Sequence, residues 1–297
     1  MNRAALLAVL LLLGCASRTP QPLTIHAPMD AAAPSARIAP ADRPTCAQPE
    51  AVCLPGGLSL LGAAAAEDHF EQRPPRVARL HDFAIDRTET TGVRYRECVA
   101  AGRCSPMRCD ADVPDAAPAR CLAWADARAY CAFRGGRLPT EAEWQRAAAG
   151  PLEVSRPFPY GTTPAAPDAS VDDLTPEGIR DLAGSLAEWV DDAGDFYPTL
   201  PAHPRLDAAV DNAVVDAALA ELPPRTDAGL LIHDDPRGVS RGPWRVVRGG
   251  DARLSWAQCS SALRRFRLPT EALPWVGVRC VYDPGSPSPV GPTRPYS

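Results

Sequence analysis

The sequence contains no lysine, because all 31 of its basic residues are arginine. Acidic residues number 36, and the formal net charge at pH 7 is −5. A protein that binds nucleic acid presents a basic face, so this charge balance argues against a nucleic-acid partner. The sequence is also rich in proline, with 34 residues. We interpret the missing lysine as part of a general bias in composition, and the arginine content alone indicates no function.

The N-terminus lacks an apolar run long enough to span a bilayer. Ala4–Leu13 is apolar over only ten residues and follows a short positive segment, Asn2-Arg3, as in a signal peptide. It leads into Leu-Leu-Gly-Cys15, which resembles a bacterial lipobox, although Leu13 is an unusual residue there. We therefore predict a lipoprotein signal peptide over 1–14, lipidation of Cys15 and anchoring to a membrane of the bacterial cell envelope, on the periplasmic or outer-membrane face. An ordinary secretory signal with a chance cysteine is the alternative.

Two segments are too poor in large apolar residues to form a core. Residues 15–45 are rich in proline and alanine, and residues 284–297 contain Pro-Gly-Ser-Pro-Ser-Pro. Such compositions do not bury enough apolar area to offset the entropy lost on ordering. We predict a disordered tether and a disordered tail, which leaves residues 46–283 as the globular part.

Ten cysteines are present, and an exported chain meets an oxidising compartment in which disulfides persist. If Cys15 carries lipid, nine remain, so one thiol has no partner. Short spacings suggest three local pairs, although connectivity does not follow from spacing: Cys46–Cys53, Cys98–Cys104 and Cys109–Cys121.

Local patterns predict a mixture of strands and helices. Thr140 and Glu143 form a capping box ahead of a helix from Glu141 to about residue 149, which Gly150 ends. The remaining predictions are strands over 53–62 and 77–85, a helix capped within 88–91, a helix over 122–133, a helix over 207–222, and an exposed polar loop at 233–235.

Four motifs occur in the order typical of one family. They are Arg-Leu-Pro-Thr-Glu-Ala-Glu-Trp at 137–144, Gly-Ile-Arg-Asp-Leu-Ala-Gly-Ser-Leu-Ala-Glu-Trp-Val at 178–190, Arg-Val-Val-Arg-Gly-Gly-Asp at 245–251 and Trp-Val-Gly-Val-Arg-Cys at 275–280. The chain resembles the formylglycine-generating enzyme or sulfatase-modifying factor family. The resemblance implies an α+β fold: one C-type-lectin-like domain over 46–283 with much irregular structure, stapled by disulfides, and an insertion at about 193–243.

The resemblance also implies a long-range disulfide between Cys131 and Cys280. Closing a loop of about 150 residues is worth roughly 4–5 kcal/mol in the chain-entropy model. With the three local pairs assigned, Cys259 is left as the free thiol.

A calcium site is the next implication of the resemblance. The family's ligands correspond to the side chains of Asp181 and Glu188 and the carbonyls of Gly184 and Leu186, while Ser185 replaces the usual asparagine. Calcium takes six to eight hard oxygen ligands, which suits acidic residues around a glycine turn. The alternative is a turn held by hydrogen bonds alone.

Copper is not expected. The family's enzyme oxidises a cysteine to formylglycine with oxygen and a copper(I) ion held by two cysteines, since thiolates are soft ligands. The second position is Cys259 here, but the first is Leu254, and the family's serine is Asp251. We therefore predict that the chain makes no formylglycine. Cys259 is then paired with another cysteine, a buried inert thiol, or a reactive remnant.

Two functional hypotheses follow. The first is an envelope-anchored, non-catalytic module, a pseudo-enzyme that binds an envelope protein or a carbohydrate on the lectin-like scaffold. The second is a divergent oxidoreductase that uses Cys259 with another cofactor. Iron-dependent relatives take their ligands from an additional histidine-rich helical domain, and this sequence has five scattered histidines.

Overall fold

A computed structural model describes residues 46–63, 72, 75–109, 112–166, 170–194, 232–234, 236 and 242–284. The predicted signal peptide, Cys15, the tether, the tail and the helix at 207–222 lie outside the described residues. Within the described part of the chain, no helix has the length and apolar character needed to cross a membrane.

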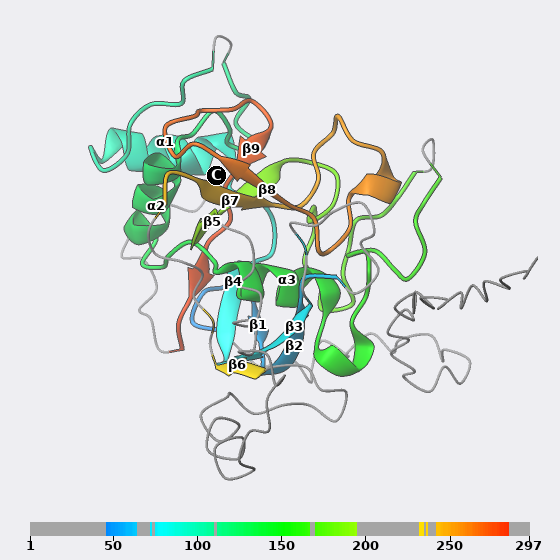
Figure 1. The fold of residues 1–297 in the computed structure, drawn as a ribbon. Coiled ribbons are helices and arrows are strands. Elements are labelled where there is room, and N and C mark those ends of the chain that lie inside the picture. The colour runs from blue at the N-terminus through cyan, green and yellow to red at the C-terminus, as the bar shows by residue number, and fades with distance from the viewer. Residues whose placement is uncertain are drawn as a thin grey trace, which may run out of the picture.

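In the described part of the chain, ten short strands form three small sheets (Figure 1). The first sheet has the order β1-β4-β10 and the second β2-β3-β6, while the third, four-stranded sheet has the order β8-β7-β5-β9. The strands are β1 Ala51–Leu54, β2 Gly57–Leu61, β3 Arg76–Leu80, β4 Phe83–Asp86, β5 Ala187–Ala193, β6 Ile232–Asp234, β7 Arg245–Arg248, β8 Arg264–Arg267, β9 Val276–Gly277 and β10 Val281–Tyr282.

The two strands predicted over 53–62 and 77–85 are each broken into two, which corrects the prediction. β1 and β4 pair in one sheet, and β2 and β3 pair in another. At the break the amide of Gly56 donates to the carboxylate of Asp82 at 2.7 Å. A side chain on Gly56 would collide with the backbone carbonyl of Leu80, so only glycine allows the two breaks to lie together.

Three α-helices are present among the described residues: α1 Gly92–Ala100, α2 Trp124–Phe133 and α3 Glu141–Ala149. The capping box of α3 is confirmed, because Thr140 Oγ1 accepts from the amide of Glu143 at 3.2 Å and Glu143 accepts from the amide of Thr140 at 2.8 Å. Thr91 is the N-cap residue of α1, within the predicted range 88–91, but its hydroxyl makes no cap hydrogen bond. Two short 3₁₀ helices, η3 Leu152–Val154 and η4 Trp256–Gln258, complete the elements.

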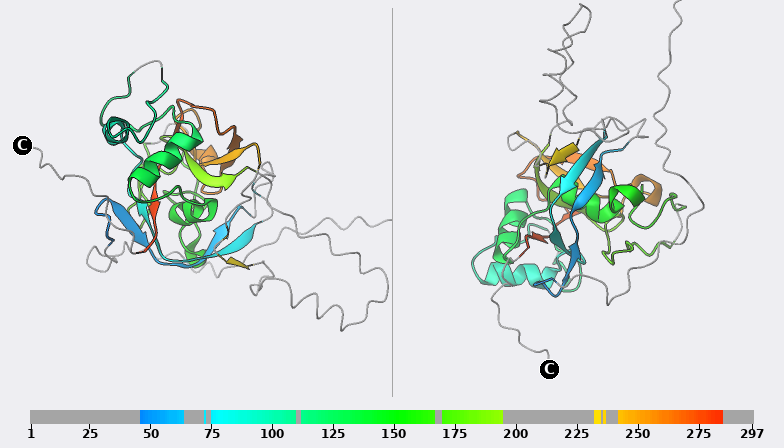
Figure 2. Two further views of the ribbon diagram at one scale, coloured as in Figure 1. Left: turned by 90° about the vertical axis from the view of Figure 1, so that its left-hand side faces the viewer. Right: turned by 90° about the horizontal axis from the view of Figure 1, so that it is seen from below.

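Helix α3 occupies the centre of the molecule, between the four-stranded sheet and the two smaller sheets (Figure 1). All nine of its residues are buried, and its Trp144 is fully enclosed. Helices α1 and α2 pack against each other at one side (Figure 2) and cover a second core around Tyr95, Tyr130 and Trp189.

The segment predicted as an exposed polar loop at 233–235 contributes a strand instead. Residues Ile232–Asp234 form β6, which pairs parallel with β3. Asp234 accepts an ion-pair hydrogen bond from Arg79 at 2.6 Å. The prediction missed this strand because its hydrogen-bonding partner lies about 155 residues earlier in the chain.

Four disulfides join the cysteines as the sequence analysis expects: Cys46–Cys53, Cys98–Cys104, Cys109–Cys121 and Cys131–Cys280. The last pair ties α2 to the segment that precedes β10, across 149 residues. Among the described residues the free cysteine is Cys259, and it is buried.

Candidate functional site

The connection from β7 to β8 carries the positions where the family places its metal. Gly249 begins it with a φ of 77°, a conformation that favours glycine. Gly250 follows with its Cα against the sulfur of Cys259 and the carbonyl of Ala183, leaving no room for a side chain. The connection therefore folds back on itself and encloses its own cysteine.

Cys259 is a buried, protonated thiol in this structure. Its side chain is 1% exposed, and Sγ donates to the carbonyl of Ser255 at 3.3 Å. Burial, and then the nearby carboxylate of Asp251, raise the pKa of Cys259 to about 11. Since the thiolate is the nucleophile and the metal ligand, these surroundings suit an inert cysteine. Of the three interpretations of Cys259, pairing with another cysteine is wrong.

Asp251 is held by two arginines. Its carboxylate accepts from Arg253 at 2.7 and 3.0 Å and from Arg265 at 2.9 Å. Burial opposes ionisation of this carboxylate, but these hydrogen bonds dominate and lower the pKa of Asp251 to about 2. Both of its oxygens are thus engaged within the protein.

These residues do not fit copper(I). The loop offers one thiol, Cys259, which is protonated, while Leu254 has no lone pair and Asp251 is a hard ligand already bound to arginine. A linear two-thiolate site needs a second sulfur that the loop does not contain.

The turn before β5 packs directly on this loop. Gly184 lies under the ring of Trp256, where a side chain would not fit, and the amide of Ala252 donates to the carbonyl of Ser185 at 3.1 Å. The residues predicted to bind calcium lie on this turn and at the start of β5, and the turn contacts the loop that holds Cys259 and Asp251. The two motifs form a single region.

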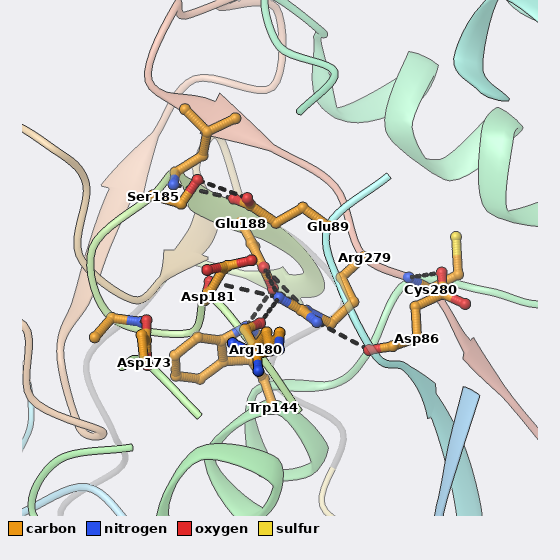
Figure 3. Close-up of polar contacts among 12 residues, drawn as sticks. Asp86, Glu89, Trp144, Asp173, Arg180, Asp181, Ser185, Glu188, Arg279 and Cys280 are labelled. Carbon is orange, nitrogen blue, oxygen red and sulfur yellow. Dashed lines mark hydrogen bonds and ion pairs between the residues drawn. The ribbon is translucent and has the colours of Figure 1, made fainter. Parts of the chain in front are cut away.

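Glu188, the second residue of β5, is fully buried where the turn meets that strand (Figure 3). Its carboxylate accepts from Arg279 at 2.8, 3.0 and 3.1 Å and from the indole of Trp144 at 2.7 Å. The guanidinium of Arg279 also donates to the carbonyls of Asp86, Arg180 and Asp181. A protein cation therefore already binds the oxygens of this turn.

Glu188, one of the four predicted calcium ligands, is already engaged in this arrangement. Both side-chain oxygens of Glu188 are hydrogen-bonded to Arg279, whereas calcium needs six to eight oxygens directed at it. Within the described residues, no group of three or more histidine, cysteine or acidic side chains is arranged to hold a metal. Calcium binding stays a prediction from the resemblance, and the geometry favours the hydrogen-bonded turn.

Two buried acids complete the region, and the sequence analysis missed both. Glu89 accepts from the hydroxyl of Ser185 at 2.6 Å and the amide of Leu186 at 3.0 Å. Burial and then the charge of Glu188 raise the pKa of Glu89 to about 8. Asp173 accepts from the amides of Ala183 and Gly184, and burial raises its pKa to about 6.

Glu89 lies directly before a helix, and we therefore interpreted it as part of the helix cap predicted within 88–91. The carboxylate instead reaches the turn before β5, 96 residues away. Arg279 sits in the Trp-Val-Gly-Val-Arg-Cys motif, and its role as the cation of the turn has no local sequence signal.

A separate surface pocket of about 840 Å³ lies where β2, β3 and the start of α3 meet. Arg137 at its wall pairs with Glu143 at 2.6 Å and Asp283 at 2.8 Å. Arg79, which also lines the pocket, pairs with Asp234. These charges neutralise one another within the protein, so the pocket gives no indication of a charged ligand.

Residues 36–284 match the family described as the sulfatase-modifying factor enzyme 1-like domain. The chain belongs to this family. The match covers most of the sequence and includes both loops of the candidate site, so the fold that the resemblance implied is confirmed.

Members of the family differ in what surrounds this domain. The chain is 28% identical over 338 residues to a formylglycine-generating enzyme of Streptomyces coelicolor, covering 88% of this chain and 97% of that one. It is 28% identical over 293 residues to a hercynine oxygenase of Mycolicibacterium smegmatis, covering 82% of this chain. It spans only 63% of the length of that hercynine oxygenase, and 54% of a formylglycine-generating enzyme of Thermomonospora curvata.

The structure of PvdO from Pseudomonas aeruginosa shares the fold, with a TM-score of 0.53 and 17% identity, covering 80% of this chain and 96% of that one. This likeness supports the sulfatase-modifying factor fold and no particular activity.

Proposed function

We propose that this member of the sulfatase-modifying factor family is an envelope-anchored binding or structural module that does not generate formylglycine. One observation carries the proposal: the loop that would hold copper(I) contains Leu254 in place of the first thiol, and its remaining Cys259 is buried and protonated. Without two thiolates the metal has no linear site, and the oxidation has no cofactor.

The occupied turn supports the same proposal. Asp251 is bonded to two arginines and Glu188 to Arg279, so the charged groups of the region hold the fold together. An oxidoreductase that used Cys259 would need a thiolate, which these surroundings disfavour.

The catalytic part of the proposal is tested with a peptide that contains Cys-x-Pro-x-Arg. The full-length protein is incubated with the peptide, copper and oxygen, and the peptide thiol is followed by mass spectrometry. The expected result is an intact thiol, beside full conversion by an active formylglycine-generating enzyme under the same conditions. Conversion at a comparable rate would overturn the proposal.

The anchoring part is tested separately in bacterial cells. Lipidation at Cys15 predicts that the protein partitions with the membrane fraction and incorporates labelled palmitate. The variant Cys15→Ser should lose the label and leave the membrane. Equal membrane partitioning of both proteins would contradict lipid anchoring.

A further inference from the structure

Five arginines form a row along one face of the four-stranded sheet. They are Arg128, Arg245, Arg267, Arg265 and Arg253, and we call them the arginine row. Arg245 and Arg267 are directly opposite each other on β7 and β8, and Arg265 lies two residues earlier on β8. Because alternate residues of a strand point to the same face, these three side chains share one side of the sheet.

An aromatic ring marks each end of the arginine row. The guanidinium of Arg245 lies 4.3 Å from the ring centroid of Trp124, and that of Arg128 lies 5.4 Å from the same ring. At the other end, Arg253 lies 3.6 Å over the ring of Trp275. These contacts orient the arginines without supplying acceptors for their N–H groups.

The arginine row carries more positive charge than its neighbours neutralise. Asp251 bonds Arg253 and Arg265, and Glu271 lies near Arg267. Burial lowers the pKa of Arg267, and the positive charges of Arg265 and Arg253 lower it further. Like charges directly opposite on paired strands are destabilising. Among the residues that the structure describes, these five cations meet two carboxylates, which leaves an excess of positive charge along the row in a protein whose net charge is negative.

Several donors along the row are buried without an acceptor in the described part of the protein. They are Nε and Nη1 of Arg245, Nε of Arg265 and Nε1 of Trp275. A buried donor that lacks an acceptor costs free energy, and native structures rarely retain several of them together. All of these groups are donors, so they add to the positive potential at the outer side of the row.

We propose that the arginine row is a docking surface for an extended acidic segment of a partner protein. This inference deepens the proposed binding function and rests on it. Guanidinium groups bind carboxylates through paired, charge-assisted hydrogen bonds. Acidic side chains at alternate positions of an extended segment would match Arg265 and Arg267, which are two residues apart on one strand.

The position of β8 favours a peptide over a sugar polymer. β8 is at the edge of its sheet, next to β7 (Figure 1). An exposed sheet edge can take up an extended peptide as an additional strand. One face of Trp124 and one of Trp275 are covered by arginine, so neither of these two rings is fully open for stacking on a sugar.

The test uses fluorescein-labelled poly-L-glutamate and the full-length protein, with binding followed by fluorescence anisotropy at low ionic strength. The double variant Arg245→Gln, Arg267→Gln should bind at least about tenfold more weakly than the wild type. The matched control, Arg79→Gln with Arg180→Gln, removes the same charge from arginines that pair with Asp234 and Asp172 elsewhere. Its affinity should stay within about twofold of the wild type.

A second variant distinguishes a loss of binding from a loss of folding. Arg128→Gln changes an exposed side chain at the end of the row and should weaken binding while leaving the thermal midpoint unchanged. Equal affinities for the row variant and the control, no binding of poly-L-glutamate, or tighter binding of polygalacturonate would each overturn the inference. Oxidation of the Cys-x-Pro-x-Arg peptide by the protein would overturn only the proposed non-catalytic function. It would leave the docking inference intact, because fluorescence anisotropy measures binding alone.

Discussion

At the residue scale, the neighbours of Cys259 and Asp251 determine how readily each side chain ionises. Both belong to the connection from β7 to β8, and the effect of each depends on groups that are distant in sequence. Asp251 is fixed by Arg265 from β8, 14 residues later. Cys259 is enclosed by Gly250 and by Ala183 of another loop. No local pattern contains this information, because it follows from how the two loops pack.

Cys259 should react slowly in the native protein. With a pKa of about 11, about one thiol in ten thousand is ionised at pH 7. Iodoacetamide at pH 7.5 should therefore leave Cys259 unmodified in the folded state and alkylate it after denaturation, as read by peptide mass spectrometry. Cys259→Ser provides the control. Complete alkylation of the native protein within minutes would show a reactive thiol and revive the oxidoreductase hypothesis.

Asp251→Ser, which restores the residue typical of the family, should destabilise the protein in a pH-dependent way. The folded-state pKa of about 2 lies below the ordinary value of 3.8, so the carboxylate stabilises the fold above about pH 4 and loses this effect as the pH falls towards 2. Because Arg253 is half exposed, we expect a loss of about 1 kcal/mol at pH 7.

Denaturant titrations at several pH values measure this difference. Asp234→Ser is the matched control, since Asp234 is an exposed carboxylate paired with the exposed Arg79. A gap between wild type and Asp251→Ser that stays constant from pH 5 to pH 2 would contradict the assignment.

At the scale of elements, local signals predicted helices better than sheets. The capping box defines α3 because Thr140 and Glu143 are three residues apart, and the aromatic and alanine pattern defines most of α2. The strands at 53–62 and 77–85 were joined in the prediction, since nothing in either run shows that Gly56 must approach Leu80. β6 was missed for the same reason, because its partner β3 is remote.

The turn before β5 should be stable without calcium. Arg279 already binds Glu188 and two backbone carbonyls there. A calcium site with ligand at about 100 times its dissociation constant would add about 2.7 kcal/mol and raise the thermal midpoint by several degrees. We expect instead the same midpoint in excess calcium and in EGTA. A calcium-specific rise that magnesium does not reproduce would restore the family's site.

At the scale of the whole molecule, the Cys131–Cys280 disulfide joins elements from both halves of the chain. In the chain-entropy model, its 149-residue separation is worth about 5 kcal/mol, whereas the six-residue separation of Cys98–Cys104 is worth about 2 kcal/mol. Replacing both cysteines of the long pair by alanine should therefore destabilise the protein more than the same change in the short pair. Guanidinium unfolding of the two variants, with all other disulfides intact, makes the comparison. Equal losses would show that loop length does not determine the stabilisation here.

The arrangement of the first sheet has a consequence for how such a domain can be combined with others. β1 and β10 are the first and last strands, and both pair with β4, which lies between them. The chain thus enters and leaves the domain two strand spacings apart, or roughly 10 Å. Neighbouring ends allow a domain to be placed inside or beside a larger protein without stretching its linkers. The domain is therefore suited to transfer between architectures as a cassette, and to circular permutation by engineering.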